Sequence, residues 1–332
     1  MSGTIAVLGA GSWGTALALA LARNGRDVRL WGHSPEHTAQ LAADRENRKH
    51  LPGTRFPNTL IPEADLHQAV AAAADILIVV PSHGFRDLLE RLAPILKPSQ
   101  RLAWATKGLD ARSGQLLHEV ADELVGPNRP LAVLSGPSFA KEVAQGLPTA
   151  VTIAATDDSF GKDFARAFHS ESFRVYTSRD ITGVELGGAV KNVLAVAAGV
   201  SDGLGFGANA RAGLITRGLA EMMRLSQALK ADPQTIMGLS GVGDLILTCT
   251  DDQSRNRRFG LALGQGNSID EAVANIGQTV EAVRTAREVY KLAQRISLDM
   301  PICEQVYYLV TGEVDAETAV RNLMARAQKA EF

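Results

Sequence analysis

Apolar runs of strand length alternate with stretches of helical periodicity through the first half of the chain. The runs that we expect to form strands cover residues 4–8, 27–32, 75–82, 101–108, 131–135, 149–155 and 173–178. Short apolar runs separated by helices are typical of a doubly wound, mostly parallel sheet. The pattern therefore predicts a Rossmann-like N-terminal domain of the α/β class.

Strand signals largely stop near residue 183, and helical patterns follow almost to the end of the chain. We expect helices over residues 210–229 and 279–296, and another helix opening at Met300-Pro301. Typical capping side chains precede three further helical patterns, namely Ser254, Asp315 and a capping box formed by Ser268 and Glu271. This shift predicts two domains, an NAD(P)-binding domain over residues 1–182 and an all-helical substrate-binding domain over residues 183–332.

One charged residue, Lys191, interrupts the long apolar helical pattern of residues 183–205. Its helical neighbours at i−4, i−3 and i+4 are Gly187, Gly188 and Ala195, which are all small. Glycine destabilises a helix interior, so adjacent glycines indicate a special requirement. They could open a notch through which a ligand reaches Lys191, or they could allow tight packing against another helix. A lysine in such a helix could also simply extend to solvent.

A glycine-rich turn, Gly9-Ala10-Gly11-Ser12-Trp13-Gly14, follows the first strand and opens a helical pattern. In this context Gly9 allows the tight turn, Gly11 lets the backbone approach a pyrophosphate, and Gly14 permits close helix–strand packing. The N-terminus of the following helix would present free N–H groups and a positive dipole end to the phosphates. The turn therefore predicts a dinucleotide site.

The end of the second strand bears on the choice between NAD and NADP. NAD-specific sites usually place an Asp or Glu there for the ribose 2′-OH. This chain instead has Trp31-Gly32-His33-Ser34, with no carboxylate before Glu36. A histidine and a hydroxyl could accommodate a 2′-phosphate, which favours NADP over NAD, although ordinary surface loop residues would look the same.

Ligands of doubly wound sheets bind beyond the carboxyl ends of the strands. Ser82, Lys107 and the segment Gly136-Pro137-Ser138 follow predicted strands and fall at that edge. Lys107 could contribute to a site there, or it could be a solvated loop charge.

Two polar segments of the second half are further candidates for site residues. Asp244 precedes an apolar run, where an Asp most often caps a helix, and a capping residue can still face a site. Ser254, Arg255 and Asn256 stand at the start of a helical pattern, where an arginine and free N–H groups suit a phosphomonoester. A solvated basic turn is the alternative. Contact with nucleic acid is disfavoured because this cluster has no aromatic partners or wider basic face.

Composition restricts the possible classes of protein further. The chain has 332 residues, which favours two domains, and a net charge of −2, which attracts neither nucleic acid nor anionic membranes. Its two cysteines, Cys249 and Cys303, have no CxxC spacing, and the seven histidines are scattered, so we expect no disulfide framework and no metal site. The N-terminal residues show neither signal-peptide features nor a membrane span. We expect a cytoplasmic protein without stable membrane insertion.

Several motifs, in order, resemble those of the bacterial NAD(P)-dependent glycerol-3-phosphate dehydrogenases. They are GAGSWGTALALALA (9–22), NRKHLPG (47–53), ATKG (105–108), SGPSFAKEV (135–143), GAVKNVLAVAAG (188–199) and GDLILTCTDDQSRNRRFG (243–260). The resemblance extends over nearly the whole chain, and residues 188–199 fit the family's signature around its catalytic lysine. It implies a homodimer that makes sn-glycerol 3-phosphate for glycerophospholipid synthesis.

The same resemblance assigns roles residue by residue. Lys191 is the catalytic lysine, and Lys107 contacts both cofactor and substrate. The other cofactor contacts are Ser12, Trp13, His33, Ala140, Arg255 and Glu281. The other substrate contacts are Gly136, Ser138, Asp244, Ser254, Asn256 and again Arg255. Beside Glu281, Thr279 stands where an aliphatic cofactor contact is expected, with Val280 adjacent.

The chemistry of these residue types agrees with the reaction that the resemblance implies. Hydride transfer to the C2 carbonyl of dihydroxyacetone phosphate leaves an alkoxide that needs a proton and a positive neighbour. A partly desolvated Lys191 with a lowered pKa would suit general acid–base catalysis. Lys107 would polarise the oxygen, Asp244 would orient Lys191 or a substrate hydroxyl, and the phosphate would supply binding energy. We expect Lys107, Lys191, Asp244 and Arg255 to converge on one interdomain cleft.

Two other functions remain compatible with the residues alone. A dehydrogenase of similar layout could act on a β-hydroxyacid or 6-phosphogluconate, although the turn at Ser254–Asn256 favours a small phosphorylated substrate. A non-catalytic NADP-sensing module would need the glycine-rich turn but would have no use for Lys191 or Arg255.

Overall fold

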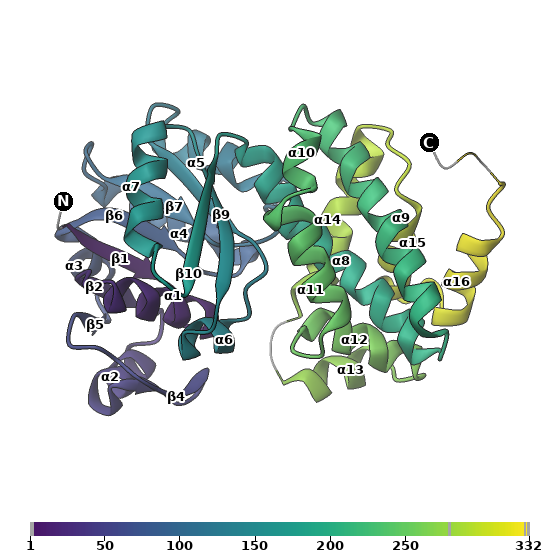
Figure 1. The fold of residues 1–332 in the computed structure, drawn as a ribbon, viewed down its shortest axis with the longest axis horizontal. Coiled ribbons are helices and arrows are strands. Elements are labelled where there is room, and N and C mark those ends of the chain that lie inside the picture. Colours follow the sequence, from purple (N-terminus) through teal and green to yellow (C-terminus); the bar gives the residue numbers. More distant parts are fainter. Residues whose placement is uncertain (1–2, 278–279, 329, 331–332) are drawn as a thin grey trace. The chain divides into compact units, whose positions relative to one another are not determined.

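The structure is a computed structural model that describes residues 3–277, 280–328 and 330 (Figure 1). The chain divides into two compact units, Met1–Glu185 and Leu186–Phe332. The first unit contains the strands and the second contains the long C-terminal series of helices, as the sequence pattern predicts.

The first unit is built on an eight-stranded sheet with the order β10-β9-β8-β7-β6-β1-β2-β5. All neighbouring pairs are parallel except β8 and β9, which are antiparallel. The strands of this sheet are β1 (Thr4–Leu8), β2 (Val28–Trp31), β5 (Leu60–Glu63), β6 (Ala73–Ile78), β7 (Arg101–Trp104), β8 (Leu131–Ser135), β9 (Thr149–Ala155) and β10 (Phe173–Ser178). A separate antiparallel pair is formed by β3 (Glu46–Asn47) and β4 (Leu51–Arg55). The mostly parallel sheet confirms the predicted fold class.

Helices cover both faces of this sheet, as Figure 1 shows. They are α1 (Ser12–Arg23), α2 (Pro35–Asp44), α3 (Leu66–Ala71), α4 (Phe85–Leu92), α5 (Leu117–Val125), α6 (Ala140–Gln145) and α7 (Asp158–Phe168). On one face, Phe160, Phe164 and Phe168 of α7 lie one helical turn apart and are fully buried. On the other face, the rings of Phe85 and Trp104 pack edge to face, 5.7 Å apart. Burial of each such aromatic side chain stabilises the fold by about 2 kcal/mol.

Two strands end four residues before the apolar runs predict. β6 ends at Ile78 instead of residue 82, although it begins earlier than expected, and β7 ends at Trp104 instead of residue 108. The apolar sequence pattern continues beyond the last residue of β6 because Val79 packs under the glycine-rich turn. A Cβ on Gly9 would lie 2.3 Å from the Val79 carbonyl oxygen. The apolar character of this residue therefore reports packing beyond the strand.

In the part of the second unit that the structure describes, the regular secondary structure is helical. The helices are α8 (Ile181–Gly203, which begins in the first unit), α9 (Gly207–Ala228), α10 (Pro233–Ile236), α11 (Asp244–Thr250), α12 (Arg255–Gly264), α13 (Ile269–Ile276), α14 (Glu281–Arg295), α15 (Pro301–Thr311) and α16 (Ala316–Met324). A π-helical turn over Leu239–Gly243 leads directly into α11. Ser254, Ser268 and Asp315 cap their helices as predicted, and the capping box of Ser268 and Glu271 is present.

Helix α8 is the central element of the helical unit. Over the described residues it is the one helix long and apolar enough to cross a membrane, but 94% of its apolar window is buried inside the fold. It packs in backbone contact with α12, because a Cβ on Gly199 would lie 2.0 Å from the Arg257 carbonyl oxygen. The reverse holds for Gly260, whose Cβ would lie 2.1 Å from the Val196 carbonyl oxygen. The apolar pattern of α8 therefore reflects a core helix.

Candidate active site

The glycine-rich turn between β1 and α1 has the shape that a dinucleotide pyrophosphate requires. Gly9 has a φ of 130°, and a Cβ on Gly14 would lie 1.8 Å from the Gly9 carbonyl oxygen. In contrast, a Cβ on Gly11 would meet no atom within 4 Å, so open space lies in front of it. Gly11 is also the N-cap of α1 and supplies no side-chain acceptor to the first-turn N–H groups. The turn fits a bound pyrophosphate.

Ser12 and Trp13, the other predicted cofactor contacts of this turn, differ in what they bind within the protein. The Ser12 hydroxyl donates a 2.7 Å hydrogen bond to the His50 carbonyl and so ties the turn to the β3–β4 connection. The Trp13 Nε1 is buried and has no hydrogen-bond acceptor among the residues that the structure describes. A buried donor of this kind is uncommon and fits a site that a ligand completes.

His33 lies exposed just beyond β2, at the position that the sequence indicates for the nucleotide ribose. The neighbouring Ser34 is the N-cap of α2, where its hydroxyl accepts from the His37 amide and donates to Glu36 at 2.8 Å. The Ser34 hydroxyl therefore has a structural role that the sequence did not indicate.

The structure brings together the predicted residues that follow β7 and β8. Lys107 Nζ lies 3.5 Å from the Gly136 carbonyl oxygen, which also accepts a 2.9 Å hydrogen bond from the Ser138 hydroxyl. Gly136 has a φ of 150°, and a Cβ there would lie 2.9 Å from the Val151 Cα, so glycine is required. Ala140 opens α6 directly afterwards. Lys107, Gly136 and Ser138 thus form one polar neighbourhood at the carboxyl end of the sheet.

Lys191 is buried in the helical unit instead of extending to solvent. The residue is 7% exposed, and its Nζ donates to Asp244 Oδ1 at 2.8 Å and to Thr248 Oγ1 at 2.9 Å. Asp244 is 1% exposed, and the Thr248 hydroxyl donates to the Asp244 backbone carbonyl at 2.6 Å. A buried ammonium thus has a carboxylate and a hydroxyl as partners, all held by helices α8 and α11.

The possibility that Asp244 caps a helix is wrong. The N-cap of α11 is Gly243, which already has helical angles of −61° and −51°, because the preceding π-helical turn continues into the helix. The Asp244 side chain is therefore directed to Lys191. The glycine beside Lys191 also has a packing role, since a Cβ on Gly187 would lie 2.3 Å from the Ser240 carbonyl oxygen. Close packing therefore explains why residue 187 is a glycine, and a notch for a ligand is not needed to explain it.

The predicted phosphate residues surround the start of α12. The Ser254 hydroxyl caps the helix by accepting from the Arg257 amide at 3.2 Å, and Asn256 Oδ1 accepts from the Ala282 amide at 3.2 Å. Arg255 is the first residue of the helix and is half-buried. The second bond joins this turn to the start of α14, where Glu281 is located. Thr279 lies outside the described residues, and Val280 is the buried N-cap of α14.

Three polar residues of this neighbourhood were not identified from the sequence. Thr248 binds Lys191, and Asn192 donates to Glu281 Oε2 at 3.2 Å. Arg257 is buried and donates to the Cys249 carbonyl at 3.1 Å and to Asp202 at 2.6 Å, which holds the turn before α12. For Asn192, its adjacency to Lys191 was the available signal in the sequence. The bonds of Thr248 to Lys191 and of Arg257 to Asp202 join residues that are 57 and 55 positions apart.

Cys249 lies near Lys191, but its surroundings disfavour the thiolate form that a nucleophile requires. It is buried, and desolvation raises the pKa of its thiol to about 12 despite the nearby positive charge of Lys191. The thiol is therefore neutral at physiological pH. Among the described residues, no group of three or more His, Cys, Asp or Glu side chains could hold a metal ion.

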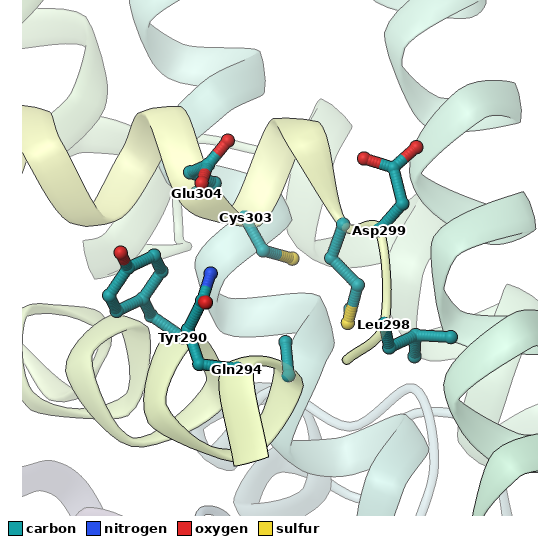
Figure 2. Close-up of a pocket in the computed structure, with 8 residues that line it drawn as sticks. Tyr290, Gln294, Leu298, Asp299, Cys303 and Glu304 are labelled. Atoms are coloured by element: carbon teal, nitrogen blue, oxygen red, sulfur yellow. The ribbon is translucent and has the colours of Figure 1, made fainter. Parts of the chain in front are cut away.

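Two cavities of the helical unit contain none of the predicted site residues. One, of about 90 Å³, lies between α14 and α15, where Figure 2 shows Tyr290, Gln294 and Cys303 along its wall. The other, of about 550 Å³, is lined by residues around the starts of α13 and α16. The predicted residues instead form two groups, one in each unit. Their convergence on one cleft stays a prediction.

Comparisons with known proteins cover both units. The family model described as NAD-dependent glycerol-3-phosphate dehydrogenase N-terminus matches residues 4–161, and the one described as the C-terminus of the same enzyme matches residues 180–321. A glycerol-3-phosphate dehydrogenase [NAD(P)+] of Halorhodospira halophila is 59% identical over 100% of this chain and 99% of its own length. The relative of the same name from Alkalilimnicola ehrlichii is 59% identical over 98% of each chain.

A solved structure is similar over the same length. The crystal structure of glycerol-3-phosphate dehydrogenase from Coxiella burnetii has a TM-score of 0.95 and 49% identity, covering 98% of this chain and 99% of that one. More distant solved structures at 15% identity, such as a D-mandelate dehydrogenase with a TM-score of 0.65, share the fold alone.

Proposed function

Because the chain belongs to the family of NAD(P)-dependent glycerol-3-phosphate dehydrogenases, we propose that it interconverts dihydroxyacetone phosphate and sn-glycerol 3-phosphate. The observation that carries this proposal is the buried set of Lys191, Asp244 and Thr248, whose ammonium is held within 2.9 Å of both partners. The nicotinamide cofactor, NAD(H) or NADP(H), supplies the hydride in one direction and accepts it in the other.

Lys191 is the proton donor and acceptor of the reaction in this proposal. During reduction of the C2 carbonyl, the ammonium gives a proton to the developing alkoxide, and during oxidation the neutral amine takes the proton back. Asp244 stabilises the ammonium and fixes its direction, and Thr248 supplies a second contact. Lys107 adds a positive charge that stabilises the oxygen.

The start of α12 would hold the substrate phosphate. The Ser254 hydroxyl and the Asn256 amide each accept one hydrogen bond through oxygen, which leaves the hydroxyl hydrogen and the amide N–H groups to donate. Arg255 adds a guanidinium, and the helix N-terminus adds a favourable dipole. Phosphate binding remote from the reacting carbon would position the carbonyl for hydride transfer.

In the same proposal, Gly9, Gly11, Ser12, Trp13, Gly14, His33 and Ala140 hold the nucleotide, with Lys107, Arg255 and Glu281 reaching it as well. Gly136 and Ser138 line the substrate site with Lys107. We further propose that NADP is preferred over NAD, and that the protein works in the cytoplasm as a homodimer without membrane insertion. Its product would serve glycerophospholipid synthesis.

The test is the loss of absorbance at 340 nm when dihydroxyacetone phosphate is added with NADPH or NADH. Lys191→Ala should reduce turnover by a factor of about 10² to 10⁴, the usual contribution of a general acid–base group. Lys162→Ala, which alters an exposed lysine on α7, is the matched control and should keep full activity. Unchanged turnover in Lys191→Ala would refute the assigned role. Absence of oxidation by the parent protein, despite cofactor binding, would favour a β-hydroxyacid substrate instead.

A further inference from the structure

Four basic or titratable side chains gather near the carboxyl end of β2, and the mechanism above uses only one of them. They are His33 after β2, His37 in the first turn of α2, and Lys49 and His50 in the connection between β3 and β4. The His37 and His50 rings pack edge to face with centroids 5.2 Å apart. His33 and Lys49 are exposed, whereas His37 and His50 are half-buried behind them. We call these four residues the histidine cluster.

The histidine cluster is tied directly to the glycine-rich turn. The Ser12 hydroxyl donates to the His50 carbonyl at 2.7 Å, and the His50 amide donates to Asn47 Oδ1 at 3.2 Å. Asn47 in turn donates to the Ala10 carbonyl at 3.0 Å and to the Thr15 hydroxyl at 2.8 Å. These bonds hold the segment from Asn47 to His50, the start of the NRKHLPG motif, against the pyrophosphate-binding turn. The cluster therefore lies where the adenosine ribose binds in this fold.

The surroundings of the two half-buried histidines favour their neutral forms. Burial lowers the pKa of His37, the charges of Lys49 and His33 lower it further, and a hydrogen bond to the Ala10 backbone opposes them. Burial likewise lowers the pKa of His50, with additional repulsion from His37, Lys49 and His33. The buried His37 Nε2 has no hydrogen-bond partner among the described residues, so a proton there would go unsatisfied. An added anion would relieve this repulsion between basic groups.

The nearby carboxylates have other partners. Glu36 is exposed and accepts from the Ser34 hydroxyl at 2.8 Å. Glu46 accepts from the Gly53 amide at 2.8 Å. Asp44 accepts from Gln40 at 2.7 Å, and Arg48 lies 3.7 Å from Asp44 and 4.0 Å from Glu46. The charged groups that lower the pKa of His37 are Lys49 and His33, and those that lower the pKa of His50 are His37, Lys49 and His33.

We propose that the histidine cluster binds the 2′-phosphate of NADP(H) and takes up protons as it does so, so that acidification strengthens binding of NADP(H) but not of NAD(H). The proposal rests on the proposed cofactor site. His33 and Lys49 are the groups that the phosphate reaches from solvent. A dianionic phosphate beside them raises the pKa of His50 and His37 and favours their protonated forms.

The sign of the effect follows from linkage. If the bound state holds more protons than the free state, affinity rises as pH falls, up to tenfold per pH unit for each proton taken up. The 2′-phosphate itself has a pKa of about 6, so its own protonation weakens binding at low pH. A rise in affinity between pH 8 and pH 6 must therefore come from the protein. We expect a gain of about fivefold for NADPH over this range and no comparable gain for NADH.

The experiment measures binding without turnover, by isothermal titration calorimetry of the full chain with NADPH and NADH between pH 8 and pH 6. Titrations at pH 6.5 in two buffers of different ionisation enthalpy count the protons taken up. The variants are Lys49→Met and the pair His37→Gln/His50→Gln. His67→Gln, which alters an exposed histidine on α3 of the same unit, is the matched control. 2′,5′-ADP and 5′-AMP, titrated in parallel, isolate the contribution of the 2′-phosphate.

We expect proton uptake on binding of NADPH and 2′,5′-ADP. This uptake should be lost in the double histidine variant and retained in His67→Gln. Lys49→Met should weaken NADPH several-fold and leave NADH unchanged. Equal pH dependence for NADPH and NADH, or an unaltered slope in the double variant, would overturn the proposal. Either result would leave the dehydrogenase assignment intact, because that assignment depends on oxidation of either cofactor by dihydroxyacetone phosphate.

Discussion

Replacement of Asp244 by asparagine tests the electrostatics of the buried lysine site most directly. The change keeps the size of the side chain and removes the negative charge 2.8 Å from Lys191 Nζ. Lys191 is 7% exposed and Asp244 1% exposed, so little water can replace the lost carboxylate. Breaking a buried ion pair on one side costs about 3 to 5 kcal/mol, because the remaining charge stays buried without its counter-charge. The Thr248 hydroxyl remains as a partner, so we expect about 3 kcal/mol.

Thermal unfolding measures this loss. For a protein unit of this size, about 3 kcal/mol corresponds to a fall in Tm of roughly 10 °C. The double variant Lys191→Met/Asp244→Asn should recover part of it, since it removes the buried charge as well. Asp270→Asn, an exposed carboxylate on α13, is the control and should change Tm little. The reasoning is refuted if Asp244→Asn unfolds within 1 °C of the parent, or if the double variant is less stable than the single one.

Two further predictions follow from the first unit. Gly14→Ala should destabilise the protein by several kcal/mol, because its Cβ would lie 1.8 Å from the Gly9 carbonyl oxygen, whereas Gly11→Ala should leave Tm unchanged and weaken NADPH binding about tenfold. Calorimetry with NADPH and thermal melts separate the two, and equal melting losses would contradict the geometry. For His118, burial lowers the pKa, but the hydrogen bond and charge of Glu185 outweigh burial and raise it. Its stabilisation is therefore present below about pH 6.5 and is lost as pH rises through the folded pKa, so His118→Gln should lower Tm more at pH 6 than at pH 8.5. A pH-independent difference would show that the charge of His118 does not contribute.

Features that depend on neighbouring residues in the chain were predictable from the sequence. Strands β9 and β10 span the predicted residues 149–155 and 173–178, because β propensity and burial are local patterns. The caps at Ser254, Ser268 and Asp315 were predictable for the same reason, since each side chain binds an amide three residues ahead. The strand–glycine turn–helix order likewise specifies its own geometry at Gly9 and Gly14.

The presence of the long helix α8 was predictable from the sequence, but the residues that surround Lys191 were not. The sequence allowed three explanations for a lysine beside adjacent glycines: a notch for a ligand, close packing of the helix, or a lysine that extends to solvent. The packing of α8 on the π-helical turn distinguishes them. Lys191 meets Asp244 across 53 residues of sequence and Thr248 across 57. Contacts of this range follow from how helices pack, and hydrophobic periodicity specifies which face is buried without specifying its partner.

The sequence by itself therefore determined the class of fold, the order of its elements, the dinucleotide turn and the family to which the chain belongs. Tertiary structure decided that Gly187 serves packing, that Asp244 pairs with Lys191 instead of capping α11, and that Asn47 and His50 hold the glycine-rich turn. The physical reason is the same in each case. Local conformation depends on a few adjacent residues, whereas the partner of a buried polar group depends on segments that only folding brings together.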